Sequence, residues 1–390
     1  MKARASASQA TCHHLLLVTA TLLVSQVSLA QTACNILLGR GKAPAVRSEN
    51  TKLPPMVATS GDKSKMLISD GGLFVQDLLT GSRSPQMQGQ FEGLYLEQIT
   101  NDGKRLLIGS RSFDLLSAPK LARPMTDAER RSPGARVFNV ETGELINYFD
   151  AGTASELSPD GKLLAAKNFR ESGFRLYDVD SGKLLRKMGG NPGQFSPDGK
   201  TLLVEGIFSS TLVDARTGEK VQRFFDRGRV SFGPTGTLWF VNGRNVTERN
   251  AVTGEVTFQA ELPKGANKYT NVARMNFSND GKIVAISTEL QNRSENERNA
   301  TLLINRETGK STVLPFGYGH QTRLSHDGRM IVVLDVTKLA VYDTKTFQEL
   351  YRFEPQMYFK DMIHGATFTG DNRQLVIRRD STTMTVDLSR

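Results

Sequence analysis

The sequence predicts an all-β chain, a β-propeller of eight four-stranded blades. Two turn motifs alternate along its 390 residues, and apolar stretches of strand length separate them. The first motif reads Phe/Leu-Ser-Pro-Asp-Gly-Lys in its clearest copies, at 157–162 and 195–200. The second reads Asp/Asn-x-x-Thr-Gly and begins at residues such as Asp178 and Asp214. Neighbouring copies of the second motif lie mostly 36–44 residues apart. Four antiparallel strands repeated at this spacing are typical of propeller blades.

The first motif has the chemistry of a hairpin turn. Proline presets φ at the first corner, aspartate accepts backbone hydrogen bonds, and glycine takes the left-handed position. We therefore interpret Asp160, Asp198, Asp280 and Asp327 as turn residues rather than catalytic carboxylates. Looser copies occur at 99–103, 232–236, 277–281, 324–328 and 368–372, and a degraded one at 59–63. With these, each motif occurs eight times, the last copy of the second being cut short at the chain end.

The blade count depends on how the last repeat is completed. The eighth copy of the second motif begins at Asp387, so no fourth strand follows it. The segment 35–39 resembles the fourth strands of other repeats and precedes the first repeat. We expect such an N-terminal strand to close the ring and remove the exposed edges. The predicted organisation is a signal peptide at 1–30, a tail with the ring-closing strand at 31–52, and the propeller at 53–390. Seven blades remain the alternative.

These repeats resemble the WD40-like and YVTN-type propellers of exported bacterial proteins. The residues that carry the resemblance are 195–200, Phe-Ser-Pro-Asp-Gly-Lys, and 177–183, Tyr-Asp-Val-Asp-Ser-Gly-Lys. It extends over most of 53–390. The Trp-Asp dipeptide of eukaryotic WD40 repeats is absent. The resemblance implies a fold more than a function, because such propellers include both scaffolds and enzymes.

The first thirty residues have the pattern of an export signal. Lys2 and Arg4 precede an apolar run at 15–29, and Ser28-Leu29-Ala30 fits a small-x-small cleavage site. We therefore expect the protein in the periplasm or at the cell surface of a Gram-negative bacterium. No later stretch is apolar enough to span a membrane. Cys34 is a candidate lipidation site, although Gln31 stands where a lipobox has an apolar residue. Membrane association is expected only if Cys34 is lipidated. Without lipidation Cys34 is a lone thiol.

The two faces of the predicted propeller differ. The turns between the first and second strands (a–b) and the third and fourth (c–d) share one face and are short. The b–c and d–a connections share the other face and carry the insertions, at 111–133, 263–271, 289–299 and 355–363. The insertion in blade 2 contains the basic residues Lys120, Arg123, Arg130 and Arg131. Because function concentrates in variable loops, we expect the b–c/d–a face to bind a partner. Insertions without function are the alternative.

Two histidines hold equivalent positions in neighbouring repeats. His320 and His364 each stand four residues before the apolar residue of an a–b turn. Both are expected near the channel mouth on the b–c/d–a face, where they could bind a metal ion or haem iron, or act as acid and base. Two ligands alone do not make a metal site. No cofactor is therefore predicted, and haem or metal at this pair remains an alternative to polar residues at a wet rim.

Three arginines lie on predicted innermost strands of consecutive blades. Arg229 and Arg274 stand three residues before the apolar turn residue, and Arg323 stands one before it. Together they could hold a carboxylate or phosphate group. The alternative is that they pack between blades.

Composition narrows the function. One Trp and two Cys exclude a disulfide scaffold. The net charge is +10, but the basic residues are not interleaved with aromatic residues as they are in proteins that stack nucleic-acid bases. We therefore expect no nucleic-acid partner. We predict an exported, non-catalytic scaffold that binds an envelope protein or an anionic ligand through its b–c/d–a face. The alternative is a periplasmic enzyme or cofactor carrier, either a haem-linked oxidoreductase or a lactonase-like hydrolase.

Overall fold

The computed structural model divides the chain into two units, of which 46–389 is the larger. The structure describes the following residues: 46–47, 56–60, 64–69, 72–78, 80–114, 134–151, 155–167, 171–206, 208–225, 228–262, 274–289, 299–315, 322–334, 338–354, 363–369, 371–379 and 383–388. All of them belong to the larger unit. The predicted signal peptide and Cys34 therefore lie outside the described residues.

The described residues form strands in eight antiparallel sheets, named blades 1–8 in chain order. Blade 1 contains β2 (Met56–Thr59), β3 (Lys65–Ser69) and β4 (Leu73–Asp77). Blade 2 contains β5 (Gln90–Ile99), β6 (Arg105–Asp114), β7 (Gly134–Asn139) and β8 (Leu145–Phe149). Blade 3 contains β9 (Ser155–Leu157), β10 (Leu163–Ala166), β11 (Phe174–Asp178) and β12 (Leu184–Met188). Blade 4 contains β13 (Asn191–Phe195), β14 (Thr201–Glu205), β15 (Ser210–Asp214) and β16 (Lys220–Phe224).

The second half of the unit repeats this order. Blade 5 contains β17 (Arg229–Phe232), β18 (Leu238–Asn242), β19 (Asn245–Arg249) and β20 (Val256–Glu261). Blade 6 contains β21 (Arg274–Phe277), β22 (Ile283–Glu289), β23 (Asn299–Asn305) and β24 (Lys310–Pro315). Blade 7 contains β25 (Thr322–Leu324), β26 (Met330–Leu334), β27 (Leu339–Asp343) and β28 (Glu349–Phe353). Blade 8 contains β29 (Ile363–Phe368), β30 (Gln374–Arg379), β31 (Thr383–Asp387) and β1 (Val46–Arg47).

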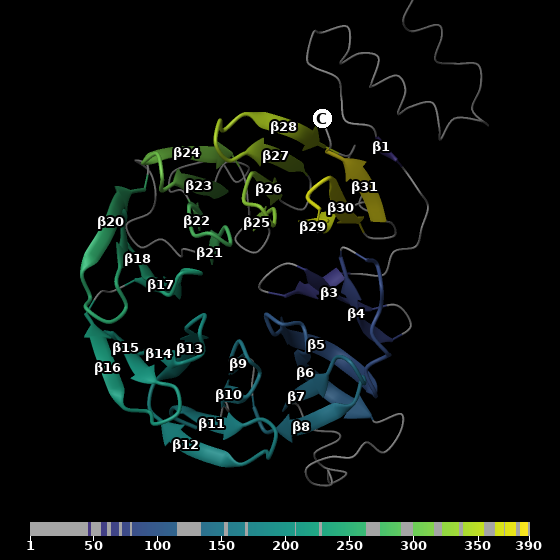
Figure 1. Ribbon diagram of the computed structural model, residues 1–390, viewed down its shortest axis with the longest axis vertical. Coiled ribbons are helices and arrows are strands. Elements are labelled where there is room, and N and C mark those ends of the chain that lie inside the picture. Colours follow the sequence, from purple (N-terminus) through teal and green to yellow (C-terminus); the bar gives the residue numbers. More distant parts are fainter. Residues whose placement is uncertain are drawn as a thin grey trace, which may run out of the picture. The chain divides into compact units, whose positions relative to one another are not determined.

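In blades 2–7 the four strands a–d follow one another in the order of the chain. The first motif forms the a–b turn and the second forms the c–d turn, as the sequence predicts. Figure 1 shows the blades following one another around a common centre with the first strand of each innermost. First strands of successive blades contact each other, for example β5 with β9 and β25 with β29. The all-β, four-stranded repeat is confirmed, and eight sheets agree with eight blades rather than seven.

Hydrophobic clusters join each blade to the next. Side chains of a strand alternate between its two faces, so Leu106 and Ile108 of β6 pack toward blade 1, while Leu107 packs toward blade 3. Burial of such a side chain contributes about 1.5–3 kcal/mol. Seven clusters of this kind join blades 1 to 8 in succession. Within the described ranges none of these clusters joins blade 8 to blade 1.

Blade 1 has three assigned strands instead of the predicted four. Residues 82–87 nevertheless run beside β4, because Ser84 N–H donates to Val75 O and Met87 N–H donates to Leu73 O, both at 2.8 Å. Between them Val75 N–H donates to the Ser84 hydroxyl at 3.0 Å rather than to a backbone carbonyl. Pro85 has no N–H to give. The fourth strand is irregular because the Ser84 hydroxyl takes the place of a backbone acceptor and because Pro85 has no N–H.

The outermost strand of blade 8 comes from the N-terminal part of the unit. β1 pairs antiparallel with β31, and Val46 lies opposite Val386. The segment 35–39, which the sequence suggests for this place, lies outside the described residues. Ring closure by an N-terminal strand stays a prediction. No helix among the described residues is long and apolar enough to cross a membrane.

Candidate functional site

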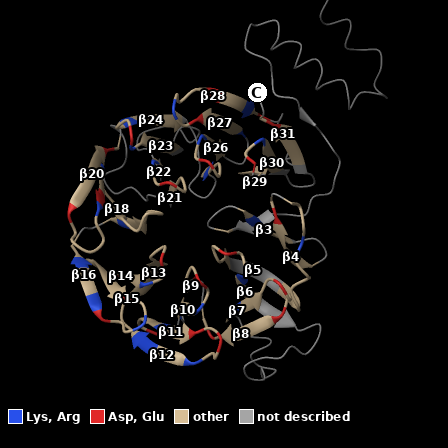
Figure 2. Ribbon diagram, viewed as in Figure 1, with Lys and Arg blue, Asp and Glu red and all other residues tan. Residues whose placement is uncertain are grey.

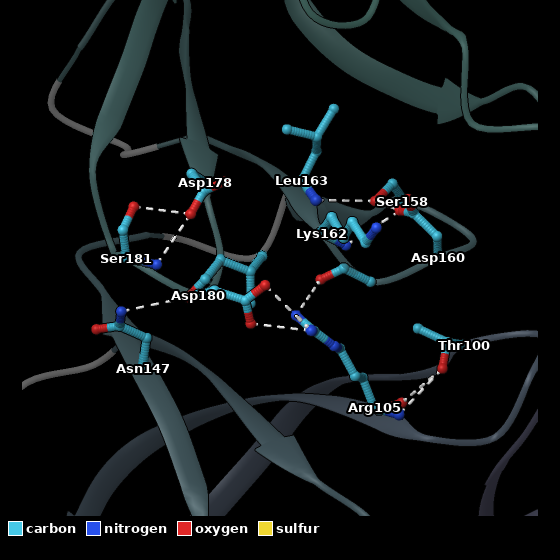
Figure 3. Close-up of polar contacts among 12 residues, drawn as sticks. Thr100, Arg105, Asn147, Ser158, Asp160, Lys162, Leu163, Asp178, Asp180 and Ser181 are labelled. Carbon is cyan, nitrogen blue, oxygen red and sulfur yellow. Dashed lines mark hydrogen bonds and ion pairs between the residues drawn. The ribbon is translucent and has the colours of Figure 1, made fainter. Parts of the chain in front are cut away.

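The a–b turns are closed by a recurring set of hydrogen bonds (Figure 3). In blade 3 the Ser158 hydroxyl donates to Asp160 Oδ1 at 2.7 Å, and Lys162 N–H donates to the same oxygen at 3.1 Å. Leu163 N–H then donates to Ser158 Oγ at 2.9 Å. The same hydroxyl–carboxylate bond joins Thr100–Asp102, Ser196–Asp198, Ser278–Asp280, Ser325–Asp327 and Thr369–Asp371. These aspartates are turn residues, as the sequence predicts.

A second set of hydrogen bonds closes the c–d turns. Asp178 Oδ1 accepts from Ser181 N–H at 2.9 Å and from the Ser181 hydroxyl at 2.7 Å. Equivalent bonds to Asp77, Asn139, Asp214, Asn250, Asn305 and Asp343 recur in the other blades. The side chains that carry the motif are therefore engaged in closing their own turns, which leaves this face with little unused hydrogen-bonding capacity at the motif positions.

Neighbouring blades are clamped together on the same face. Arg105 of blade 2 donates from Nη1 to Gly161 O at 3.0 Å and forms an ion pair with Asp180 at 2.9 Å (Figure 3). Asn147 Nδ2 donates to Val179 O at 3.3 Å. Gly161 has φ of 70°, and a Cβ there would lie 2.3 Å from Arg105 Cδ. The turn face is a structural network, and the described residues hold no group of three His, Cys, Asp or Glu suited to a metal ion.

The turn network predicts acid sensitivity. The Ser196 hydroxyl lowers the pKa of Asp198, and Ser181 N–H lowers that of Asp178, against an ordinary value of 3.8. The pKa is also lowered for Asp160, Asp214, Asp280 and Asp371. Groups with a depressed folded-state pKa contribute stability that is full above the unfolded-state pKa and is lost as pH falls through the folded-state pKa. We expect the thermal midpoint to fall steeply between about pH 4 and pH 2.

Thermal unfolding followed by circular dichroism across that pH range checks this expectation. Asp198→Asn keeps an acceptor for Ser196 but cannot titrate, so its midpoint should depend less on pH than that of the wild type. A midpoint that stays flat from pH 5 to pH 2 in the wild type contradicts the role assigned to these carboxylates.

The structure places four predicted site residues on first strands of consecutive blades. Arg229 begins β17, Arg274 begins β21, Arg323 is the middle residue of β25, and His364 lies in β29. The side chain of Arg229 is exposed and that of Arg323 is half-buried. His364 is the extra residue of a β-bulge, because Ile363 lies opposite Arg379 while Gly365 lies opposite Arg378. His320 lies outside the described residues, so the paired-histidine site stays a prediction.

Two glutamines on first strands connect one blade to the next. Leu157 N–H donates to Gln98 Oε1 at 2.9 Å, and Gln98 Nε2 donates back to Leu157 O at 3.0 Å. Gln194 Oε1 accepts from Phe232 N–H at 3.0 Å. Each amide thus pairs with the inner edge of the following blade as a strand would. The sequence reasoning missed these residues, although polar side chains directly before the apolar turn residue recur and were visible.

Arg323 occupies the same register as these glutamines. Glu156 and Asn276 stand there in blades 3 and 6. Asn276 is one methylene shorter than glutamine, and within the described ranges its buried Nδ2 has no hydrogen-bond partner. At this register the two glutamines join blades 2 and 3 and blades 4 and 5. Packing and anion binding both stay predictions for Arg323.

The b–c/d–a face carries two highly exposed aromatic side chains in blade 4. Phe208 lies in the b–c connection and is 64% exposed, and Phe225 follows β16 and is 73% exposed. The Arg223 guanidinium lies 4.9 Å from the Phe225 ring centre, and its Nε donates to Ser209 Oγ at 3.0 Å. Lys120, Arg123, Arg130 and Arg131, predicted for the same face, lie outside the described residues.

Comparisons with known proteins identify the fold. The C-terminal WD40 domain of Sif2 aligns with a TM-score of 0.58 and 11% identity over 89% of this chain and 99% of that chain. KlHsv2 with loop 6CD replaced by a Gly-Ser linker aligns with a TM-score of 0.51 and 11% identity over 74% of this chain and 90% of that one. Hydrazine synthase of Kuenenia stuttgartiensis aligns with a TM-score of only 0.49 and 15% identity, over 77% and 97% of the two chains.

Neither a family model nor a curated protein matches the sequence. At such low identity the structural similarity shows the fold alone. The repeated four-stranded sheets and the two WD40 domains together place the chain among the β-propellers.

Proposed function

We propose that this chain is an exported, non-catalytic β-propeller scaffold that binds a partner through its b–c/d–a face. In this proposal residues 1–30 direct export to the periplasm or cell surface of a Gram-negative bacterium. An N-terminal strand closes the ring, and the relatives are the exported bacterial WD40-like and YVTN-type propellers. The partner is an envelope protein or an anionic ligand.

The contrast between the two faces carries this proposal. On the a–b/c–d face, the motif side chains are engaged in turns and in clamps such as Arg105–Asp180. On the other face, Phe208 and Phe225 expose most of their surface, beside an arginine already held in place. Aromatic residues and arginine dominate the binding energy of protein interfaces. A preorganised arginine also loses little entropy on binding. These features support a protein-binding site at this corner of blade 4.

A site-specific photocrosslinker tests the proposal in the native host. A benzoylphenylalanine residue at position 208 or 225 is expected to form a discrete adduct with one partner. The same residue at position 252 is the control, because Val252 is 70% exposed but lies in a c–d turn on the opposite face. Equal adducts from all three positions, or none from 208 and 225, contradict the proposed face. A mature N-terminus at Gln31, read by mass spectrometry, tests export.

The second candidate is a periplasmic enzyme or cofactor carrier that uses His320 and His364. The bulge at His364 favours it, since bulges often re-aim a side chain beside a functional site. An ultraviolet-visible spectrum and metal analysis of the purified mature protein separate the two candidates. A Soret band or stoichiometric metal that is lost in His364→Ala supports the second candidate and contradicts the scaffold proposal.

A further inference from the structure

A β-bulge recurs in the fourth, outermost strand of most blades. In blade 3, Leu176 lies opposite Arg186 and Tyr177 opposite Leu184, so Leu185 is the extra residue. The same shift makes Ile146, Val221, Thr257 and Leu350 the extra residues of blades 2, 4, 5 and 7. A bulge of this kind leaves its extra residue outside the ladder of paired residues. The side chain at this position is therefore free to vary between blades.

Blades 3 and 4 use this position differently from blades 2 and 7. Ile146 packs against the cluster between blades 2 and 3, and Leu350 packs against the one between blades 7 and 8. Leu185 and Val221, by contrast, are 43% and 40% exposed. The preceding position shows the same difference, because Leu184 is 39% exposed whereas its counterpart Leu145 in blade 2 is buried. The rim of blades 3 and 4 thus exposes apolar side chains at positions that blades 2 and 7 pack inward. Blades 5 and 6 each expose one valine on the outer strand, Val256 and Val313.

The charges on these two outer strands are all of one sign. β12 contains Arg186 and Lys187, and β16 contains Lys220 and Arg223, with no Asp or Glu in either strand. Lys183 directly precedes β12, whereas the equivalent residue before β16 is the exposed Glu219. Figure 2 shows this basic colouring on β12 and β16. In β28 of blade 7, Arg352 is neutralised by Glu349 and Glu354. β20 of blade 5 has a single acidic residue, Glu261. β24 of blade 6 has Lys310 and no acidic residue. Among the described outer strands, two basic residues without an acidic one occur only in β12 and β16.

The two outer strands form one continuous surface. The Arg186 side chain extends from β12 onto the c–d turn of blade 4, where a Cβ on Gly218 would lie 2.7 Å from Arg186 Cδ. Both strands are the free edges of their sheets. We call β12, β16 and Lys183 the basic rim.

We infer that the basic rim binds an extended acidic segment of a partner protein, with apolar residues between its carboxylates. Carboxylates complement the lysine and arginine side chains, and apolar residues cover Leu184, Leu185 and Val221. The inference goes beyond the proposed function, because it concerns the outer rim. Arg223 belongs to both the rim and the corner with Phe225, so it is left unchanged in the variants that test the rim. Edge strands accept extended segments, although the bulge at Leu185 interrupts the edge, so side-chain contacts dominate the binding.

Two observations favour a protein segment over a lipid surface. The three apolar side chains are each only about two-fifths exposed, so they lie level with the rim. Binding to a bilayer requires apolar groups that reach about 5–10 Å into the interface. Protection of the edge against aggregation also does not explain the rim, because lysines alone would protect it and the exposed leucines beside them work against that role.

Fluorescence anisotropy with a labelled peptide of alternating Glu and Leu tests this inference on the mature protein. We expect saturable binding that weakens as salt is added. The variant Lys183→Glu/Lys187→Glu/Lys220→Glu should weaken it at least tenfold. The control Lys310→Glu/Lys345→Glu/Arg373→Glu makes the same charge change at exposed positions of blades 6–8 and should alter binding less than twofold. Leu185→Ser/Val221→Ser should weaken binding at high salt as well.

Several outcomes overturn the inference. One is the absence of saturable binding, and another is equal weakening in the rim and control variants. Equal affinity for a Lys–Leu peptide would also overturn it. So would binding to phosphatidylglycerol vesicles that the acidic peptide does not displace, which would assign the rim to lipid. Crosslinking at positions 208 and 225 is measured separately, so failure at the rim and failure at the b–c/d–a face can be told apart.

Discussion

Replacing Arg306 by Val is expected to lower the free energy of unfolding by about 3–5 kcal/mol, because it leaves the buried carboxylate of Glu248 without its charged partner. Glu248 is 1% exposed and lies in β19. Its Oε1 accepts from the Thr237 hydroxyl at 2.8 Å, and its Oε2 lies 2.7 Å from Arg306 Nη2 of blade 6. Within the described residues Oε2 accepts no hydrogen bond, so the contact acts chiefly as an ion pair between blades.

In other blades, apolar residues occupy the positions of Glu248 and Arg306. Glu248 stands in the register of Leu176, Leu212 and Val341, all buried, and Arg306 in that of Val179 and Ala215. A buried ion pair can often be exchanged for apolar residues without loss. We therefore expect the double variant Glu248→Leu/Arg306→Val to keep nearly wild-type stability. Glu248→Ala should lose less stability than Arg306→Val, because the Arg306 side chain that it leaves is 33% exposed.

The fluorescence of Trp239 measures this effect directly, since it is the single Trp of the chain and lies opposite Glu248 in the sheet. Urea unfolding followed at this residue gives the stability of each variant. Equal losses in Arg306→Val and in the double variant would contradict the exchange of an apolar pair for a charged one.

Replacing Trp239 by Ala should cost a similar amount, about 3–5 kcal/mol, through the cavity it leaves. Trp239 is 1% exposed, and its ring centre lies 5.6 Å from that of Phe258 and 5.8 Å from that of Phe277. Phe277 belongs to blade 6, so the indole joins two blades. Urea unfolding followed by far-ultraviolet circular dichroism measures the loss.

Val256→Ala provides the comparison for Trp239→Ala. Val256 lies on β20 of the same blade but is 46% exposed, so its truncation should change stability by less than about 0.5 kcal/mol. A loss below about 1 kcal/mol in Trp239→Ala would show that the interface between blades 5 and 6 collapses around the vacancy.

The repeat could be predicted from the sequence because its turns restrict which residue types can stand at each position. Six of the a–b turns place a hydroxyl, a carboxylate and a left-handed residue at fixed spacing, and Asn372 with φ of 60° replaces glycine without breaking the pattern. The turn of blade 5 forms with Gly233 and Thr235 in place of the hydroxyl and the carboxylate. Local rules of this kind are readable in one chain. The irregular fourth strand of blade 1 could not be predicted in this way, because the Ser84 hydroxyl accepts a hydrogen bond where a regular strand would offer a backbone carbonyl.

Contacts between blades were the harder part to predict. Gln98 and Gln194 are polar residues on short strands, and Glu248 and Arg306 lie far apart in the sequence. Their roles depend on which side chain of one blade faces which backbone group of the next, and the periodicity within a blade carries no such information. Arg229, Arg274, Arg323 and His364 lie on first strands, as the sequence predicts. Anion binding by the arginines stays a prediction, and the spectrum and metal analysis of His364→Ala test the histidine.

The pairing of β1 with β31 has a consequence for how the protein is made. Blades 2–7 draw their strands from consecutive stretches of chain, so each can assemble soon after its own residues emerge during synthesis. Blade 8 joins Val46 to Val386 and must wait for almost the entire polypeptide. Contacts between such distant residues form slowly, because the intervening chain loses entropy when its ends meet. Until then the N-terminal strand remains available to chaperones.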